Sequence, residues 1–501
     1  MKNNLGESRV QNGGVRETGM NRREFAMSAV LLGIAGQTRF ATGAEKITNP
    51  AADFYEEPAR KVPVRKFDVV VAGGGTAGVF AAIAAARQGA RTALIEVKGY
   101  TGGTVVEGGT ALHSFFNLWK AFPGVKKRQV VRGIPSEIVD RLTKAGGCSG
   151  HAEMVAGYNY DSVNTSVDTE IYKLVSMEML SETGVFMALN TMVVGAAVDG
   201  SHVRGAIVES RSGRELFAAK AFVDTTAYGH LAAYAGAKYS EPNDYDVANS
   251  IGVAGVDLDK VVKYVEENGG PGNLALGLHD GVPGGVVRLS GPRGGGKPDL
   301  LMTTVHDDYF MFVKFNVKMP VSPTDRDATA TAELQLRKQQ RQWIEHARKN
   351  IPGCEKAFIS RTSPTLNIRR GRLIACDYDI THEDVIEGRH FDDDVMAYGF
   401  HDMAPRLQVK NGGTYGIPYR AFLPTGIDNV LCAGMMITSD HRAHMSTRNT
   451  VSCMAQGQAV GTAAALCAAA AGCGTRRLPY ADLRKALEKG GVHFETAADN
   501  T

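Results

Sequence analysis

A glycine-rich turn between an apolar segment and an alanine-rich segment constrains the fold of this 501-residue chain more than any other feature. The turn is Gly73-Gly74-Gly75-Thr76-Ala77-Gly78. The apolar residues 67–72 before it predict a buried strand, and the alanines after it predict a helix to about Gln88. Gly89 is expected to end that helix, and residues 91–96 predict the next strand. The sequence therefore predicts a strand–helix–strand unit with two parallel strands, of the Rossmann type.

The glycine spacing in this turn favours a site for a dinucleotide pyrophosphate. Such a site needs free backbone N–H groups at a helix N-terminus and no side chains in the way. Gly73 permits the tight turn, Gly75 permits close approach of the phosphates, and Gly78 lets the helix pack against the sheet. Thr76 and Ala77 begin the helix and are predicted to face the phosphates. The alternative is a purely structural glycine turn, and the position between strand and helix argues against it.

A carboxylate follows where a ribose would bind. Glu96 ends the second predicted strand, and a carboxylate there accepts hydrogen bonds from ribose hydroxyls. Gly103 and Thr104 come next and place a glycine and a hydroxyl along the path of the second half of a flavin dinucleotide. Later segments add Asp224 after a strand at 221–224, Gly434 after a strand at 429–433, and Gly457 and Gly461. The last two are assigned to the start of a helix over about 456–471, whose dipole can face the pyrimidine edge of a flavin.

The remaining pattern predicts an α/β fold with two parts. Short strands between residues 192 and 219 predict an antiparallel meander beside the parallel sheet. Between 236 and 411, glycine and proline clusters surround two predicted helices, 258–268 and 328–349, which indicates an inserted α+β substrate domain. The predicted division is a signal segment 1–44, a linker 45–65, a discontinuous Rossmann-type FAD-binding domain 66–235 and 412–475, the insertion 236–411, and a C-terminal tail 476–501.

These motifs together resemble the FAD-dependent oxidoreductases of the glutathione-reductase-like superfamily, in the branch that includes the flavin subunit of heterodisulfide reductase and fumarate-reductase-type flavoproteins. The resemblance covers about residues 66–472 and is most specific from Gly416-Ile417-Pro418-Tyr419-Arg420 through Gly461. It implies non-covalently bound FAD, lined by motifs that end at Gly78, Glu96, Gly103, Asp224, Gly434 and Gly461.

The chain also departs from that family. Tyr228 and His230 stand where the family has two acids, and Met435 stands where it has an arginine. These changes affect the expected tuning of the flavin and leave the expected binding in place. The seven cysteines form no C-x-x-C pair, so neither iron–sulfur clusters nor a metal site is predicted.

Candidate catalytic residues lie between the Gly434 strand and the Gly457 helix. In such a fold the segment 440–448 would lie on the reactive side of the flavin. His441, His444 and Arg448 are the candidates for acid, base and anion-binding residue, and Asp440 is assigned to the cofactor. The alternative is that these side chains only bind loop carbonyls. Arg369 and Arg372 could bind a carboxylate or phosphate, or could equally brace two domains against each other.

The N-terminal residues predict export. Asn21-Arg22-Arg23-Glu24-Phe25 precedes a short apolar run at 26–36, the pattern of a twin-arginine signal, with expected cleavage after Ala44. The predicted partners are therefore the twin-arginine export machinery and a small-molecule substrate, in a periplasmic or other extracytoplasmic location. The 56 basic and 53 acidic residues give a net charge of only +3, which argues against nucleic acid as a partner. No later segment predicts a membrane span.

Three functions remain open at this level. The first is an FAD-dependent oxidoreductase that acts on a small organic molecule, with substrate and electron acceptor undetermined. The second is a flavin-binding electron carrier or scaffold without turnover. The third is an NAD-dependent enzyme without flavin.

Overall fold

The computed structural model describes residues 57–108, 111–117, 125–148, 150–154, 163–268, 274–279, 282–289, 301–303, 306, 308–399, 409–470 and 474–500. The predicted signal segment 1–44 and residues 45–56 of the predicted linker lie outside the described residues. The chain divides into two compact units, Met1–Lys61 and Val62–Thr501. The elements below all belong to the second unit.

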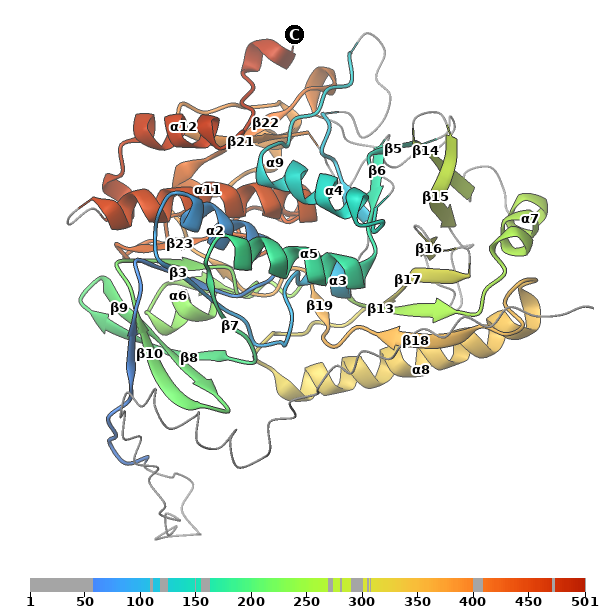
Figure 1. The fold of residues 1–501 in the computed structure, drawn as a ribbon, viewed down its shortest axis with the longest axis horizontal. Coiled ribbons are helices and arrows are strands. Elements are labelled where there is room, and N and C mark those ends of the chain that lie inside the picture. The colour runs from blue at the N-terminus through green and yellow to red at the C-terminus, as the bar shows by residue number, and fades with distance from the viewer. Residues whose placement is uncertain are drawn as a thin grey trace, which may run out of the picture. The chain divides into compact units, whose positions relative to one another are not determined.

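A five-stranded parallel sheet carries the glycine turn (Figure 1). Its neighbouring strands all pair in parallel, in the order β23 (Val430–Cys432), β11 (Ala221–Asp224), β2 (Val69–Ala72), β3 (Thr92–Ile95) and β7 (Phe186–Ala188). All four residues of β2 are buried, as expected for a strand covered on both faces. The predicted Rossmann-type parallel sheet is confirmed.

Alternate side chains of this sheet face two different layers, because successive residues of a strand point to opposite faces. Val69 and Val71 pack with a helical layer, and Val70 and Ala72 pack with an antiparallel meander. The helices are α2 (Thr76–Arg87), α4 (Ile134–Lys144), α5 (Thr169–Glu182) and α11 (Thr450–Ala469). The meander is β8 (Met192–Asp199), β9 (His202–Ser210) and β10 (Gly213–Ala218), with β1 (Val64–Lys66) parallel to β10.

A second, antiparallel sheet of ten strands lies beside the helices (Figure 1). Its strands are, in order, β18 (Phe358–Thr362), β13 (Val247–Ala254), β17 (Tyr309–Val317), β16 (Leu301–Thr303), β15 (Val282–Leu289), β14 (Leu274–His279), β5 (Ala152–Met154), β6 (Val163–Ser166) and β4 (Ala111–His113), with β19 (Asn367–Ile368) also paired to β13. The long helix α8 (Arg326–Asn350) packs on this sheet through Leu336 and Trp343. Strands β4, β5 and β6 come from outside the predicted insertion, and at three or four residues each they are too short to show a strand pattern.

Shorter elements complete the unit. They are α3 (Thr104–Glu107), α6 (His230–Tyr234), α7 (Leu258–Asn268), α9 (His382–Ile386), α10 (His444–Thr447), α12 (Tyr480–Lys489), the pairs β12 (Tyr239–Ser240) with β20 (Leu373–Ile374) and β21 (Asp394–Tyr398) with β22 (Tyr415–Pro418), and 3-10 turns at Lys410–Gly412, Tyr419–Phe422, Thr475–Arg477 and Ala497–Asn500.

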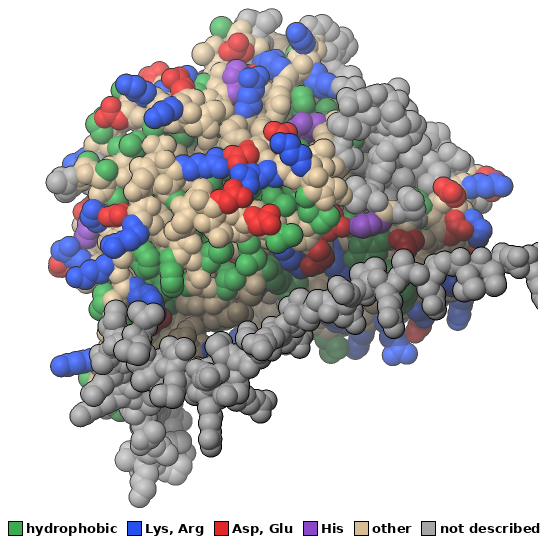
Figure 2. Space-filling view, viewed as in Figure 1, with side chains coloured by type: hydrophobic (Ala, Val, Ile, Leu, Met, Phe, Trp, Pro, Cys, Tyr) green, Lys and Arg blue, Asp and Glu red, His purple; other side chains and the backbone are tan. Residues whose placement is uncertain are grey.

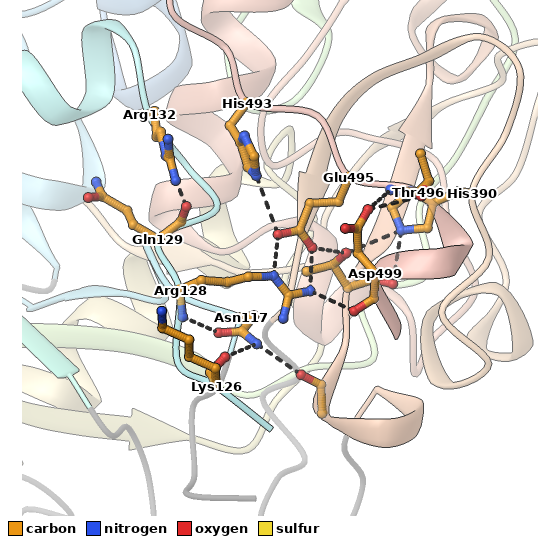
Figure 3. A network of polar contacts seen from close by, with 12 residues as sticks. Asn117, Lys126, Arg128, Gln129, Arg132, His390, His493, Glu495, Thr496 and Asp499 are labelled. Atoms are coloured by element: carbon orange, nitrogen blue, oxygen red, sulfur yellow. Dashed lines mark hydrogen bonds and ion pairs between the residues drawn. The ribbon is translucent and has the colours of Figure 1, made fainter. Parts of the chain in front are cut away.

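A buried carboxylate fastens the C-terminal segment (Figure 3). Glu495 accepts hydrogen bonds from Arg128 at 2.6 and 2.8 Å and from Thr414 Oγ1 at 2.7 Å. Such a bidentate arginine–carboxylate pair fixes geometry as well as charge. Because α12 also buries Leu483 and Leu487, the C-terminal segment is packed onto the rest of the unit.

The surface and the thiols show few special features. Within the described residues, no helix combines the length and apolar character that a bilayer span requires, and no three metal-binding side chains cluster. The six cysteines that the structure describes are free thiols. Figure 2 shows basic and acidic side chains interspersed over the coloured part of one face.

Candidate cofactor and active site

A cavity of about 510 Å³ opens at the carboxyl ends of β2, β3, β11 and β23. Ligands of open α/β sheets bind at this edge. Another wall comes from Ala248 and Asn249 of β13 in the ten-stranded sheet and from the segment 363–367, which links β18 to β19. The first turn of α11 closes a third side with Asn449, Thr450 and Cys453.

Most of the predicted cofactor residues line this cavity. Eight of the thirteen do so, namely Gly73, Gly75, Thr76, Ala77, Glu96, Gly103, Thr104 and Gly434. Arg448 is the one predicted catalytic residue that lines it. Among the described residues, the structure thus joins the glycine turn, Glu96 and Arg448 around a single space, which Lys98 and Glu107, paired with each other, also line.

The glycine turn leaves room where a pyrophosphate would bind. Gly73 has φ +96°, and a Cβ there would lie 2.5 Å from the carbonyl oxygen of Thr225. At Gly75 the nearest atom to an added Cβ would be Gly103 Cα at 3.8 Å, so a larger side chain would extend into the cavity. No side chain caps the N-terminus of α2 at Gly75. The turn therefore fits a phosphate group held by the N–H groups and the dipole of α2.

Gly78 has a different position, outside the cavity lining. A Cβ there would lie 1.7 Å from the carbonyl oxygen of Gly73. This residue permits close packing of α2 against the turn, as the glycine pattern predicts.

Glu96 is held by the same turn. Its Oε2 accepts a 2.7 Å hydrogen bond from the Gly74 N–H, and its Oε1 accepts one at 2.9 Å from the Lys98 N–H. Burial raises the pKa of Glu96, and the backbone donors of Lys98 and Gly74 oppose that shift. A carboxylate has about four acceptor positions, so capacity remains for ribose hydroxyls.

Two acids predicted to bind the cofactor instead hold turns. Asp224 is fully buried and accepts hydrogen bonds from the N–H groups of Thr226 and Ala232, at 3.0 and 2.8 Å. Asp440 accepts from the N–H groups of Arg442 and Ala443, at 2.8 and 2.9 Å. Neither carboxylate lines the cavity, because each one binds backbone N–H groups of its own turn.

The prediction that the C-terminal helix starts near Gly457 is wrong. Helix α11 begins at Thr450, so Gly457 and Gly461 lie in its interior. A Cβ on Gly457 would lie 2.1 Å from Ala77 O, and one on Gly461 would lie 2.1 Å from Ala81 O. These glycines let α11 pack against α2 and do not line the cavity. The helix end that does line it is at Asn449 and Thr450, where no side chain provides a cap.

His444 is placed in the core and not at the cavity. It is fully buried, with Nε2 3.2 Å from the Arg369 carbonyl oxygen and Nδ1 3.0 Å from Ser439 Oγ. A carbonyl only accepts, so Nε2 carries the proton and Nδ1 accepts from the serine. Burial, together with the charges of Arg448 and Arg370, lowers the pKa of His444 well below its ordinary value. The geometry thus binds this neutral ring to a loop carbonyl and a serine hydroxyl, which agrees with the alternative that His444 only bonds to the loop.

His441 and Arg448 differ in position. His441 is exposed, and its Nδ1 lies 2.8 Å from Asp244 Oδ2, which also accepts from Arg370. His441 does not line the cavity. Arg448 does, and its guanidinium lies 5.6 Å from the centre of the Tyr245 ring. Arg448 is thus the residue of this segment that brings charge to the site.

Several cavity residues were absent from the predicted site. They are, among others, Thr191, Met192 and Val193 at the start of β8, Tyr228 and His230 after β11, and Ser363, Thr365 and Asn367 before and within β19. Tyr228 and His230 were visible as departures from the family pattern. Burial raises the pKa of Tyr228 and lowers the pKa of His230. The segment 363–367 carried no motif.

The two arginines of the insertion brace the structure. Arg372 is buried and donates to Glu241 Oε1 at 3.0 Å, and it lies 4.2 Å from the centre of the Tyr239 ring. Arg369 Nη2 lies 3.5 Å from Asn316 Oδ1. Neither arginine lines the cavity.

Comparison with known proteins gives one family and many structural likenesses. The family model described as FAD dependent oxidoreductase matches residues 68–487. A geranylgeranyl bacteriochlorophyll reductase-like protein from Thermoplasma acidophilum is 15% identical, with 85% of this chain and 83% of that chain covered and a TM-score of 0.44. The p-nitrophenol 4-monooxygenase PnpA from Pseudomonas putida DLL-E4 is 12% identical, with 88% of this chain and 93% of that chain covered and a TM-score of 0.45. The flavin-dependent brominase Bmp2 is 13% identical, with 85% of this chain and 84% of that chain covered and a TM-score of 0.42.

Proposed function

Because this chain belongs to the family of FAD-dependent oxidoreductases, we propose that it transfers a hydride or an electron pair between a small organic anion and an acceptor by way of FAD. When bound, FAD supplies the two-electron redox chemistry. The protein's own task is to hold the cofactor, to place the substrate and to exclude water. We also propose that this chain belongs to the glutathione-reductase-like superfamily. The order of its sequence motifs supports this placement.

The cavity offers groups for three parts of FAD, namely the pyrophosphate, a ribose and the flavin ring. The N–H groups of Thr76 and Ala77 at the start of α2 would hold the pyrophosphate. Glu96 would accept hydrogen bonds from the ribose hydroxyls. The uncapped start of α11 at Asn449 and Thr450 would face the electron-rich edge of the flavin ring with its positive dipole end.

The position of Arg448 is the single observation that carries the substrate class. A guanidinium is charged at every physiological pH and binds carboxylates with paired hydrogen bonds. Arg448 follows α10, two residues before the start of α11, and lines the same cavity as the glycine turn. An organic anion bound to Arg448 would therefore share the cavity with the cofactor.

The experiment is anaerobic mixing of the yellow enzyme with organic acids and with uncharged analogues such as the corresponding amides. We expect at least one acid to bleach the flavin absorbance, and its amide to bleach it at least tenfold more slowly at equal concentration. Bleaching only by uncharged compounds would refute the anionic substrate. The absence of flavin bands from protein refolded with FAD would refute the cofactor assignment.

We also propose that the protein is exported by the twin-arginine route. Arg22 and Arg23 followed by a short apolar run support this proposal. The route carries folded proteins, which suits an enzyme that must bind its cofactor before export.

A further inference from the structure

We propose that Tyr234, whose ring is stacked beside that of His230, stacks on the adenine ring of FAD and makes the site prefer FAD over FMN. The proposal rests on the proposed function, because it takes FAD as the cofactor and Glu96 as the residue that binds a ribose. Tyr234 is then a specificity-determining residue for the cofactor.

Three large apolar side chains are about half-exposed although they line the cavity. The exposed fractions are 51% for Val97, 52% for Met192 and 48% for Tyr234. A ligand in the cavity can therefore reach all three side chains. Apolar and aromatic side chains that stay accessible together in a concave site are the usual lining for an apolar part of a ligand.

The backbone places these side chains next to the carboxylate that is proposed to bind a ribose. Val97 follows Glu96 directly, and Met192 follows Thr191, whose N–H donates to the Glu96 carbonyl oxygen at 2.9 Å. Tyr234 ends α6, and α6 packs against β8, the strand that begins at Met192. A base attached to a ribose at Glu96 would therefore meet an apolar surface.

The order of the parallel sheet indicates that this base is adenine and not the flavin. The glycine turn follows β2, which lies between β3 on one side and β11 and β23 on the other. Glu96 follows β3, whereas Gly434 follows β23 and donates its N–H to Gln456 of α11 at 2.8 Å. Since the pyrophosphate joins the two halves of FAD, a flavin at the α11 end of the cavity leaves adenosine for the β3 end.

His230 provides Tyr234 with an aromatic neighbour. The planes of the two rings lie within 25° of each other, with centroids 6.4 Å apart, and Tyr228 lies edge-on to His230 at 6.1 Å. All three residues line the cavity. Burial lowers the pKa of His230, so the imidazole is neutral at pH 7. The histidine that replaces a family acid thus adds uncharged aromatic surface to this end of the cavity.

Stacking on a base gives an expected size for the effect. An aromatic side chain stacked on a base strengthens binding by about tenfold, and burial of a methionine side chain contributes about as much. FMN carries the flavin ring and one phosphate and has no adenosine, so it gains nothing from this surface. ADP carries the adenosine and no flavin, so it should depend on the surface as FAD does.

The test measures the affinities of the full-length protein for FAD, FMN and ADP by isothermal titration calorimetry, after the bound flavin has been removed. The variants are Tyr234→Ala, Tyr234→Phe and Met192→Ala, and the control is Leu334→Ala. Leu334 is 57% exposed on α8 and is not among the residues that line the cavity. Circular dichroism checks that each variant is folded.

We expect Tyr234→Ala and Met192→Ala each to weaken the binding of FAD and ADP by about tenfold and that of FMN by less than about twofold. Tyr234→Phe keeps the ring, so it should bind all three ligands like the wild type, as should Leu334→Ala. The proposal is overturned if Tyr234→Ala leaves the affinities for FAD and ADP unchanged, or if it weakens FAD and FMN equally. If Tyr234→Ala does not fold, the same two outcomes in Met192→Ala overturn it.

The wild type supplies two further outcomes. If it binds FMN as tightly as FAD, the cavity has no adenine site and the proposal is overturned. If it binds neither FAD nor FMN, the proposed function itself is refuted.

Discussion

The backbone N–H of Gly74 donates a 2.7 Å hydrogen bond to Glu96 Oε2, so the glycine turn and the carboxylate proposed to bind the ribose hold each other in place. A Cβ on residue 74 would lie 2.9 Å from the Glu96 Cβ, which explains why the middle position of the turn is also a glycine. Two parts of the proposed cofactor site that lie 22 residues apart are thereby positioned as one unit before any ligand binds. Such preorganisation lowers the entropic cost of binding.

Replacement of Gly75 tests the phosphate site. We expect Gly75→Val to fold and to purify without FAD, because the added methyl groups extend into the cavity and not into packed protein. Thermal melting and the flavin absorbance measure the two outcomes. The matched control is Gly195→Val, where the new Cβ would meet Ile207 Cδ1 at an ordinary 3.4 Å, away from the cavity lining. A yellow Gly75→Val protein would show that the phosphates bind elsewhere.

Replacement of Gly461 tests the packing of α11 on α2. We expect Gly461→Ala to lower the free energy of unfolding by about 2 kcal/mol or more, since its Cβ would lie 2.1 Å from Ala81 O. The control Gly195→Ala should change it by less than about 1 kcal/mol. Unfolding in urea, followed by circular dichroism, gives both values. A Gly461→Ala protein of wild-type stability that has lost FAD would instead support the original assignment to the cofactor.

The strand–helix–strand unit could be predicted from the sequence because local pattern and tertiary role agree there. The glycine turn, the alanine-rich helix and the apolar strands were placed within about two residues of α2, β2 and β3. The start of α11 could not be placed, because Thr450, Val451 and Ser452 are weak helix formers and tertiary packing overrides that preference. The sequence therefore predicts a helix start at Gly457 and Gly461, which lie inside α11.

The orientation of individual polar side chains could not be predicted either. His441, His444 and Arg448 lie within eight residues, yet one is exposed, one is buried and one lines the cavity. The bend through α10 separates them, and no sequence period describes such a short irregular segment. The position of Asn367 at the cavity could not be predicted, because its two-residue strand carries no pattern of its own.

The buried neutral His444 predicts a pH dependence of stability. Burial is the main cause that lowers the pKa of His444 in the folded protein. As the pH falls through about 6.5, the histidine of the unfolded chain takes up a proton, whereas His444 in the native protein stays neutral. Stability from this residue is therefore present above pH 6.5 and decreases as the pH falls below it, by up to about 1.4 kcal/mol per pH unit.

The measurement compares the wild type with His444→Gln in urea at pH 7.5 and pH 5.5. We expect the stability difference between the two proteins to shrink by about 1 kcal/mol at the lower pH, because glutamine does not titrate. If the stability difference between the two proteins did not change with pH, His444 would have the same protonation in the folded and the unfolded state.

Export predicts a dependence on the arginine pair. We expect Arg22→Lys together with Arg23→Lys to leave the precursor in the cytoplasm, because the paired arginines are the most specific feature of the signal. Cell fractionation and immunoblotting measure the distribution. Equal periplasmic amounts of both versions would refute the twin-arginine route.

Arg448 provides the most direct test of the proposed chemistry. The measurement is anaerobic stopped-flow bleaching of the flavin by an acid that reduces the wild type, with Arg448→Ala and the control Arg442→Ala. Arg442 is exposed in the same segment and does not line the cavity. We expect Arg448→Ala to retain FAD and to need about 10- to 100-fold more acid for half-maximal bleaching, as for the loss of a charged hydrogen-bond pair, while Arg442→Ala behaves as wild type. An Arg448→Ala enzyme that holds FAD and is bleached at the wild-type concentration would contradict the binding of an organic anion at this site.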